Sequence, residues 1–326
     1  MNISRIAKYS WGVLFYNLIV ILWGVYVRAS GSGAGCGSHW PLCNGEIIPQ
    51  TPRVETIIEF THRIMSGLSL FLVLGLFIWA WRKYPNGHIV RKGVAFSLFF
   101  IVTEALVGAG LVLFEWVAND ASLGRAISMA VHLLNTFLLL ASLTVTAWWV
   151  STGDQIRVRT QGVILFGLGI GLVSVMVLGT TGAITALGDT LFPSGSLSQG
   201  LQQDFSPTAN FLIRLRVWHP LFAIATGFYL IFVASLLAFL HEKQVVRRFA
   251  VILILLFFTQ LVAGLLNLLL LAPVWMQIIH LLLADSLWIV LVLLTTVNLY
   301  ASEYIPAVLE PQPSALKKVH PGFPRG

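Results

Sequence analysis

Eight long apolar runs, separated by short polar stretches, dominate this chain. A bilayer core about 30 Å thick needs roughly 20 apolar residues in a helix to cross it, and several of the runs meet that length. Only 10% of the residues are charged, whereas a soluble domain carries about 25%. Because backbone groups inside a bilayer must bond internally, the runs are expected to be helices. The sequence therefore predicts an all-α integral membrane protein.

We expect eight transmembrane helices, at residues 11–28, 59–81, 93–114, 125–150, 161–182, 211–239, 247–271 and 274–300. The first run follows Arg5 and Lys8 and continues to Arg28 without a small-residue cleavage site. It is therefore interpreted as a helix that also directs the chain to the membrane. The net charge of +7 is explained by topology signals, and we expect no nucleic-acid partner.

Lysine and arginine gather in the loops on one side of the predicted helices. That side carries Arg5, Lys8, Arg82, Lys83, Arg91, Lys92, Arg157, Arg159, Lys243, Arg247, Arg248, Lys317, Lys318 and Arg325. The other side carries fewer, each near a helix end. Since cytoplasmic loops are the basic ones, both termini are predicted to face the cytoplasm of a bacterial cell (inner) membrane. The polar, proline-containing tail at 302–326 is predicted to be disordered.

The first outward loop, at about 29–58, is rich in glycine and holds both cysteines of the chain, Cys36 and Cys43. An outward loop lies in an oxidising compartment, where such a pair can close a disulfide. Two free thiols, or a metal site shared with His39, are the alternatives. The disulfide is favoured because two cysteines and one histidine make an incomplete zinc site.

The two halves of the chain repeat one pattern. The recurring segments are Thr103–Gly110 with Thr259–Leu266, Val131–Leu134 with Ile279–Leu282, His62 with His219, and the glycine-rich ends of the first helices at 30–35 and 179–188. Four helices separate each position from its copy, so the repeats are parallel and related by an axis along the membrane normal. We expect two pseudo-symmetric four-helix bundles, at 1–152 and 153–301.

One histidine falls on the second helix and one on the fourth helix of each half; the four are His62, His132, His219 and His280. Ionisable residues inside a membrane are costly and functional by default. A lone histidine can simply bond a neighbouring carbonyl, but four at duplicated positions favour ligation. Two imidazoles facing each other across a bundle form the usual axial pair of a low-spin heme. Zinc or copper would need three or four ligands, so heme iron is predicted.

Arginines near these histidines suit heme propionates by charge and by their forked geometry. They are Arg63, Arg125, Arg214 and Arg216. Snorkelling toward the membrane surface is the alternative, above all for Arg125 and Arg214. Arg63 and Arg216 are therefore the predicted cofactor-binding arginines. The remaining histidines lie in loops or the tail and are interpreted as solvated; they are His39, His88, His241 and His320.

The halves differ in the turn before the first histidine. Glu59 precedes His62 by one turn and shares its face, whereas the equivalent position of the second half holds Arg216. A carboxylate near a heme edge can donate or accept a proton, and its alternative role is a helix-terminus or propionate-site charge. The asymmetry indicates that one half stores a permanent cofactor and the other acts on a substrate.

These motifs resemble those of the heme A synthase family, in its bacterial type with a cysteine pair in the first outward loop. The resemblance covers nearly the whole chain and rests on Glu59–Arg63, Val131–Leu133, Trp218–Pro220, Ile279–Leu281 and the loop of Cys36 and Cys43. It implies oxidation of the C8 methyl of heme O through an alcohol to the formyl group of heme A, which serves terminal oxidases. It further implies heme b held by His219 and His280, heme O near His62 and His132, and Glu59 as the catalytic residue.

The resemblance also implies that the cysteines support heme transfer or loop structure. Its expected partners are the heme O substrate, the lipid bilayer, an electron acceptor of unknown identity and heme O synthase (protoheme farnesyltransferase). Glu104 and Asp285 are further intramembrane acids, and Glu104 matches Gln260 in the repeat, so that position is interpreted as needing a hydrogen-bonding side chain.

Two other functions fit the four histidines. One is a di-heme b-type cytochrome that passes electrons, for instance from quinol; the other is a heme transporter or chaperone. Electron transfer does not need the carboxylate of Glu59, whereas methyl oxidation does. A transporter predicts that both hemes are exchangeable and chemically unchanged.

Overall fold

A computed structural model describes residues 4–153 and 162–300, with the side chain of residue 300 excepted. The tail at 302–326, predicted to be disordered, lies outside the described residues. Within the described part, eight helical segments are long and apolar enough to cross a membrane, which confirms the predicted number of spans. The main helices are α1 (Arg5–Ala29), α2 (Val54–Lys83), α3 (Ile89–Leu113), α4 (Leu123–Thr152), α5 (Gly162–Leu191), α8 (Trp218–Leu240), α9 (Gln244–Leu269) and α10 (Val274–Tyr300).

Three short helices lie in the segments that connect the main helices. They are the 3₁₀ turn η1 (Ser32–Ala34), α6 (Leu197–Asp204) and α7 (Phe211–Arg214). Capping side chains set several helix starts, since an oxygen at the N-cap satisfies an amide of the first turn. Ser4 accepts from the Ala7 amide at 3.3 Å, and Ser122 accepts from the Arg125 amide at 3.2 Å.

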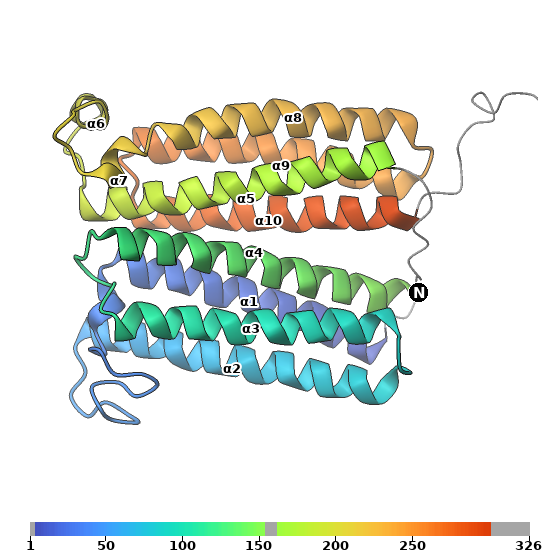
Figure 1. Cartoon of the computed structure of the whole chain (residues 1–326), viewed down its shortest axis with the longest axis horizontal. Helices are drawn as coiled ribbons and strands as arrows, with labels where there is room; N and C mark the ends of the chain where they lie inside the picture. Colours follow the sequence, from blue (N-terminus) through green and yellow to red (C-terminus); the bar gives the residue numbers. More distant parts are fainter. Residues whose placement is uncertain (1–3, 154–161, 301–326) are drawn as a thin grey trace, which may run out of the picture.

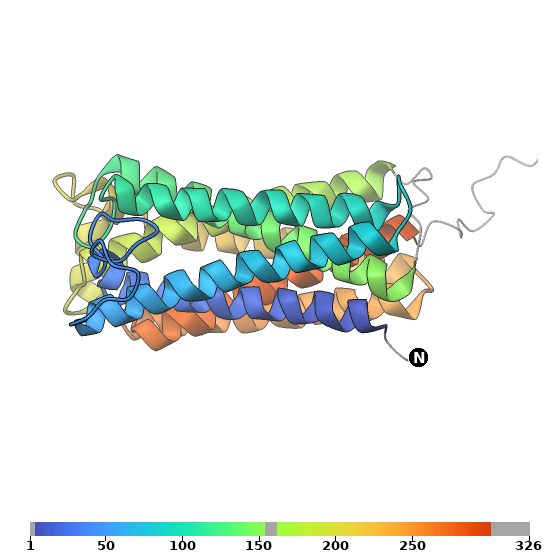
Figure 2. The ribbon, with the colours of Figure 1, turned by 90° about the horizontal axis from the view of Figure 1, so that it is seen from below.

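The helices form two four-helix bundles that lie side by side (Figure 1). In the first, α1 packs on α2 and α4, and α3 packs on α2 and α4; in the second, α8 packs on α5 and α9, and α10 packs on α5 and α9. The loop after α1 and the segment with α6 and α7 lie at the same end of the molecule in both views (Figure 2). This confirms an all-α membrane fold built as two bundles.

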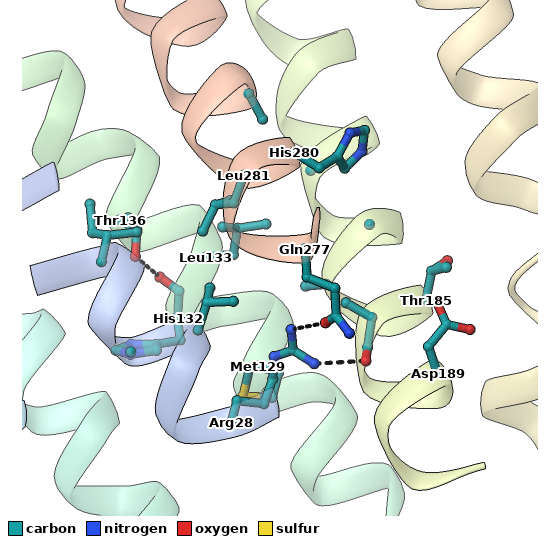
Figure 3. A pocket seen from close by; sticks show the side chains of 18 of the residues that line it. Arg28, Met129, His132, Leu133, Thr136, Thr185, Asp189, Gln277, His280 and Leu281 are labelled. Carbon is teal, nitrogen blue, oxygen red and sulfur yellow. Dashed lines mark hydrogen bonds between the residues drawn. The ribbon is translucent and has the colours of Figure 1, made fainter. Parts of the chain in front are cut away.

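The bundles meet along α1 and α4 of the first and α5 and α10 of the second. Trp288 donates its indole N–H to the carbonyl of Phe137 at 2.7 Å, and the two rings stack with centroids 5.0 Å apart. Arg28, in the last turn of α1, reaches into the second bundle and donates to Gln277 at 2.7 Å (Figure 3). It also donates to the Ala186 carbonyl at 2.7 Å. The Arg28 guanidinium therefore ties the two halves together at the end that carries the loops.

The structure corrects the predicted end of the fifth span. The fifth span was expected to end at 182, within the glycine-rich stretch at 179–188, but α5 continues through this stretch to Leu191. Glycine is tolerated inside membrane helices because it lets neighbouring groups approach closely. A β-carbon at Gly179 would lie 2.6 Å from Phe137, and one at Gly188 would lie 3.1 Å from the Leu212 carbonyl. These glycines are packing positions and not helix ends.

The sixth span also differs from the prediction. The expected single helix at 211–239 is two helices, α7 and α8, with residues 215–217 between them. Pro220 stands in the first turn of α8, where proline lacks only an amide that has no intrahelical partner. Arg216 lies in this interruption and His219 is the second residue of α8, with its amide donating to the Arg216 carbonyl at 3.2 Å.

Candidate functional site

One cavity of about 1190 Å³ extends through both halves, and all four predicted histidines line it. Ordinary ligand pockets occupy about 300–1,000 Å³, so this cavity exceeds the usual size for one ligand. Each histidine lies within the first ten residues of its helix, at the end that carries the loops. His132 and His280 belong to different bundles, and both appear in the same view of the cavity (Figure 3).

A glycine on the preceding main helix faces each histidine ring. A β-carbon on Gly24 would lie 3.1 Å from Cε1 of His62; for Gly108 and His132 the distance is 3.9 Å, and for Gly182 with His219 and Gly264 with His280 it is 3.0 Å. At three of these positions a methyl group would already press on the ring. The four glycine–histidine pairs repeat the duplication at the site itself.

The second half brings its two histidines into a geometry that suits one metal between them. The ring centroids of His219 and His280 are 6.3 Å apart, with an interplanar angle of 85°. A metal–imidazole bond is about 2.0–2.1 Å, so two rings on opposite sides of one metal have centres roughly 6.3 Å apart. The buried Nδ1 of His280 has no hydrogen-bond partner among the described residues. The pair therefore fits axial ligation of a heme iron.

In the first half, the disulfide loop holds Glu59 beside His62. The Glu59 side chain is buried at 4% exposure and lines the cavity. The Cys36 amide donates to Glu59 Oε2 at 2.8 Å, and Arg63 donates to Oε1 and forms an ion pair with it. The Arg63 guanidinium also donates to the carbonyls of His39 and Leu42. Both carboxylate oxygens are thus fixed by groups that belong to, or are bound by, one loop.

The predicted disulfide between Cys36 and Cys43 is confirmed. This pairing removes the alternatives of free thiols and of a metal site shared with His39. The loop presses against the first turn of α2: Thr56 donates to the Gly35 carbonyl at 2.7 Å, and a β-carbon on Gly35 would lie 2.3 Å from the Glu55 carbonyl. Only glycine fits at Gly35, and the close approach brings the Cys36 amide to Glu59.

Arg216 lines the cavity in the second half and is held by two aspartates. It forms ion pairs with Asp189 of α5 at 2.9 Å and with Asp204 of α6 at 2.8 Å. Burial raises the pKa of the Asp204 carboxyl, and the Arg216 guanidinium opposes that rise. Each half therefore has an ion pair near its first histidine. The position one turn before that histidine holds the acid Glu59, paired with Arg63, in the first half, and the base Arg216, paired with two aspartates, in the second.

The other predicted residues lie as follows. Arg125 lines the cavity, but its guanidinium donates to the carbonyls of Ala118 and Asp120 and so fastens the loop before α4. Arg214 is exposed and is not among the residues that line the cavity. Glu104 lines the cavity beside His132, at 3.5 Å. Asp285 is fully buried, and its oxygens have no hydrogen-bond partner in the described part of the chain.

The remaining histidines occupy the loop ends. His39 is exposed, His88 caps α3 by accepting from the Val90 amide at 3.2 Å, and His241 is the C-cap residue of α8. His320 lies outside the described residues. None of the three described histidines lines the cavity.

Sequence reasoning missed three parts of the site: Asp189, Asp204 and the glycines that face the histidines. Gly108 and Gly264 stand at matching positions of the quoted repeat, so their recurrence was a readable signal. The ion pair between Arg216 and Asp204 forms because α6 folds back toward the start of α8. No periodic pattern in the sequence predicts this contact.

The sequence model of the COX15-CtaA cytochrome oxidase assembly proteins matches residues 7–292. This chain belongs to that family. The match confirms the resemblance that the histidine motifs and the cysteine pair indicated.

Individual relatives of this COX15-CtaA protein differ in length and in name. A Thermus thermophilus protein named protoheme IX farnesyltransferase is 54% identical over 293 residues, which are 90% of this chain and 48% of that protein. The chain therefore spans about half the length of that relative. A heme A synthase of Exiguobacterium sibiricum is 29% identical over 70% of this chain and 74% of its own length. A heme A synthase of Halalkalibacterium halodurans is 41% identical over 39% of this chain and 42% of its own length.

The glycine–histidine pairs give a first test of this COX15-CtaA site. Gly182→Val is expected to displace the His219 ring and to lower the heme bound per purified chain, because the added branch enters space the ring occupies. Gly169→Val on the same helix is the matched control, since a β-carbon there meets nothing within 4 Å. Heme content is measured as the pyridine hemochrome. Equal heme content in the two variants would show that the close approach at Gly182 is unimportant.

The disulfide loop gives a second test. If Glu59 acts on a substrate in this cavity, Cys36→Ser combined with Cys43→Ser is expected to lower turnover roughly 10- to 100-fold, since a loosened loop no longer fixes Glu59 and small misplacements of a reacting group are costly. Any heme held between His219 and His280, in the other bundle, is expected to stay. Turnover is measured as product heme per chain, with thiol-reduced wild type as the parallel sample. Full turnover in both samples would show that Glu59 is held without the disulfide.

Proposed function

We propose that this protein is a heme A synthase, which oxidises the C8 methyl of heme O through an alcohol to the formyl group of heme A. The observation that carries the proposal is the buried carboxylate of Glu59, which shares a cavity with His62 and His132 and has Arg216 in its place in the second half. Electron transfer between two hemes gives no reason for this difference. The names of two relatives, heme A synthase in each case, support the same activity.

The two halves have different tasks in this proposal. Residues 153–301 hold heme b through His219 and His280, and residues 1–152 receive heme O at His62 and His132. Bound heme b supplies one-electron redox chemistry inside the membrane. Arg63 and Arg216 are the arginines that can meet propionates, each already placed at the cavity wall by carboxylate partners. Residues 302–326 form a cytoplasmic tail.

Glu59 is the proton-handling group of the first half. Conversion of CH₃ to CH₂OH takes up an oxygen atom from water and releases two electrons and two protons. Conversion of CH₂OH to CHO releases two more electrons and two more protons, and the electrons of both steps pass to an external acceptor. A positioned carboxylate can accept such a proton during the step. The Cys36 amide and Arg63 hold both oxygens of Glu59 at fixed positions. Glu59 is therefore kept at the cavity wall.

Heme O synthase is the proposed partner. The relative named protoheme IX farnesyltransferase is about twice as long as this chain, and the matched segment covers 48% of it. Farnesylated heme leaves a bilayer with difficulty, so direct contact between this chain and a heme O synthase lets heme O pass without leaving the membrane. Cross-linking in intact membranes, followed by mass spectrometry, tests the contact.

The proposed setting is the bacterial cell membrane, with both termini in the cytoplasm. The basic loops lie at the end opposite the disulfide loop, as expected from the charge rule. The disulfide then lies on the outer, oxidising side. Cysteine-accessibility labelling of single cysteines introduced at loop positions tests the orientation.

One experiment separates the three functions. Heme O is supplied to cells that express the protein, and extracted hemes are separated by chromatography with mass detection. Heme A or its alcohol intermediate is the expected product, and cells with the empty vector are the control. Unchanged heme O that remains firmly bound indicates a di-heme cytochrome. Unchanged heme O that exchanges freely indicates a transporter or chaperone.

A further inference from the structure

A second carboxylate that lines the cavity lies close to a histidine of the first half. Glu104 lies in the middle of α3, and its Oε1 is 3.5 Å from Nδ1 of His132. The two side chains are 17% and 27% exposed, so the contact lies largely inside the protein. Nδ1 of His132 is buried and has no hydrogen-bond partner among the residues the structure describes. The separation of 3.5 Å is slightly longer than an N–H···O bond, so Glu104 is the carboxylate within reach of this nitrogen.

Two residues of α4 hold the Glu104 carboxylate in place. Thr136 donates its hydroxyl to Oε1, and Asn135 donates its amide to Oε2. Asn135 is itself oriented by Thr103, whose hydroxyl donates to its side-chain oxygen at 2.6 Å. These residues lie within one turn of His132 or of Glu104. The carboxylate is therefore fixed against the helix that carries the histidine, as a positioning group requires.

The second half lacks this arrangement. The repeat places Gln260 opposite Glu104, Leu283 opposite Asn135 and Ala284 opposite Thr136. Gln260 lies 3.4 Å from Nε2 of His280, which is the other ring nitrogen, and Nδ1 of His280 stays without a partner in the described part of the chain. A plain membrane-packing role would not distinguish the halves in this way. At the matching positions of the described repeat, the carboxylate and its two side-chain donors are present beside His132 and absent beside His280.

We propose that Glu104 is a positioning residue for His132, accepting the Nδ1–H of the imidazole so that Nε2 faces the iron of the substrate heme. This inference rests on the proposed function, because it takes the first half as the site of heme O. The partner of one ring nitrogen fixes which nitrogen ligates, and a carboxylate makes the ligating nitrogen a stronger donor. Hydrogen bonds to a charged acceptor are about twice as strong as neutral ones. Glu104 would thereby stabilise the ferric form of the first-half heme relative to the ferrous form.

The test compares Glu104→Gln with the wild type by redox titration of the purified, heme-loaded protein. Glutamine has the same shape but no charge, so the midpoint potential of the first-half heme is expected to shift to a more positive value. The second-half heme is expected to keep its potential. Titration in a His280→Ala background assigns the shifted signal to the first half. The low-spin electron paramagnetic resonance signal of the oxidised first-half heme is expected to shift in the same variant.

Asn135→Leu with Thr136→Ala provides a second variant built from the residues that the other half carries. It keeps the Glu104 charge and removes both clamps, so a smaller shift in the same direction is expected. If Glu104→Gln does not accumulate, this double variant alone tests whether Glu104 positions His132. Unchanged potential and resonance signal in the variants that fold would overturn the role of Glu104. Heme analysis of the wild type tests the proposed function separately. Absence of heme A would contradict that function, whatever the midpoint potentials of the two hemes are.

Discussion

His280→Ala is expected to remove heme b from the protein and to leave the heme site of the first half loaded. In the proposed function each heme is held by one histidine pair. His219 and His280 have ring centroids 6.3 Å apart, and no other histidine among the described residues lines the second half of the cavity. Loss of one axial ligand leaves a single protein bond to the iron, so the heme-to-chain ratio is expected to fall by about half. Pyridine hemochrome assays and extracted-heme chromatography measure both quantities.

His241→Ala is the matched control for this experiment. His241 ends the same helix that begins near His219, yet it does not line the cavity, so its removal is expected to leave both hemes bound. The reciprocal variant His132→Ala is expected to spare heme b and to weaken retention of heme O. Retention of heme b by the purified His280→Ala protein at the wild-type ratio would contradict the assignment of the second half as the cofactor site.

Much of this fold could be predicted because the membrane reduces the problem to apolar length and loop charge. The eight spans and the four cavity-lining histidines follow from hydropathy and from the duplication alone. The prediction failed at residues 179–188, where glycines were read as the end of the fifth helix. Within a bilayer a helix keeps its backbone bonds through glycine, and the small residue admits Phe137 against Gly179 and the Leu212 carbonyl against Gly188.

The parts that could not be predicted are contacts between distant segments. In the sequence, Arg28 only marked the end of the first apolar run, yet its guanidinium donates to Ala186, Thr190 and Gln277 of the other half. The aspartates that bind Arg216 come from the end of α5 and from α6, a short helix without an apolar period. Such pairings depend on how loops fold back over the bundle. The local sequence shows which residues can form such contacts, but it does not show which distant residues they contact.

The cysteine pair shows how a local signal gains meaning only in the fold. Spacing and compartment predicted the disulfide, but its consequence appears only when the loop lies on α2. Cys36 then donates its amide to Glu59, and the Arg63 guanidinium bonds carbonyls of His39 and Leu42 within the same loop. Loop and carboxylate are one unit. The loop can therefore support the chemistry without any cysteine touching the substrate.

Glu59→Gln is expected to lower turnover by at least about 10²-fold while both hemes remain bound. General acid–base groups contribute typically 10²–10⁴-fold, and glutamine keeps the shape of the side chain but cannot accept the proton. Its amide oxygen can still accept from the Cys36 amide, so the loop is expected to hold its place. Product heme per chain, measured by chromatography with mass detection, gives the turnover. The heme-to-chain ratio of the same sample shows that the substrate still enters.

Glu55→Gln is the control, one turn earlier on the same helix and exposed. It makes the same chemical change outside the cavity and is expected to keep wild-type turnover. Glu59→Asp retains the carboxylate on a shorter stem, so an intermediate turnover is expected because the oxygens no longer meet both Cys36 and Arg63. Wild-type turnover in Glu59→Gln would assign Glu59 a purely structural role beside Arg63. The asymmetry with Arg216 would then reflect loop docking, and the first half would need another proton acceptor.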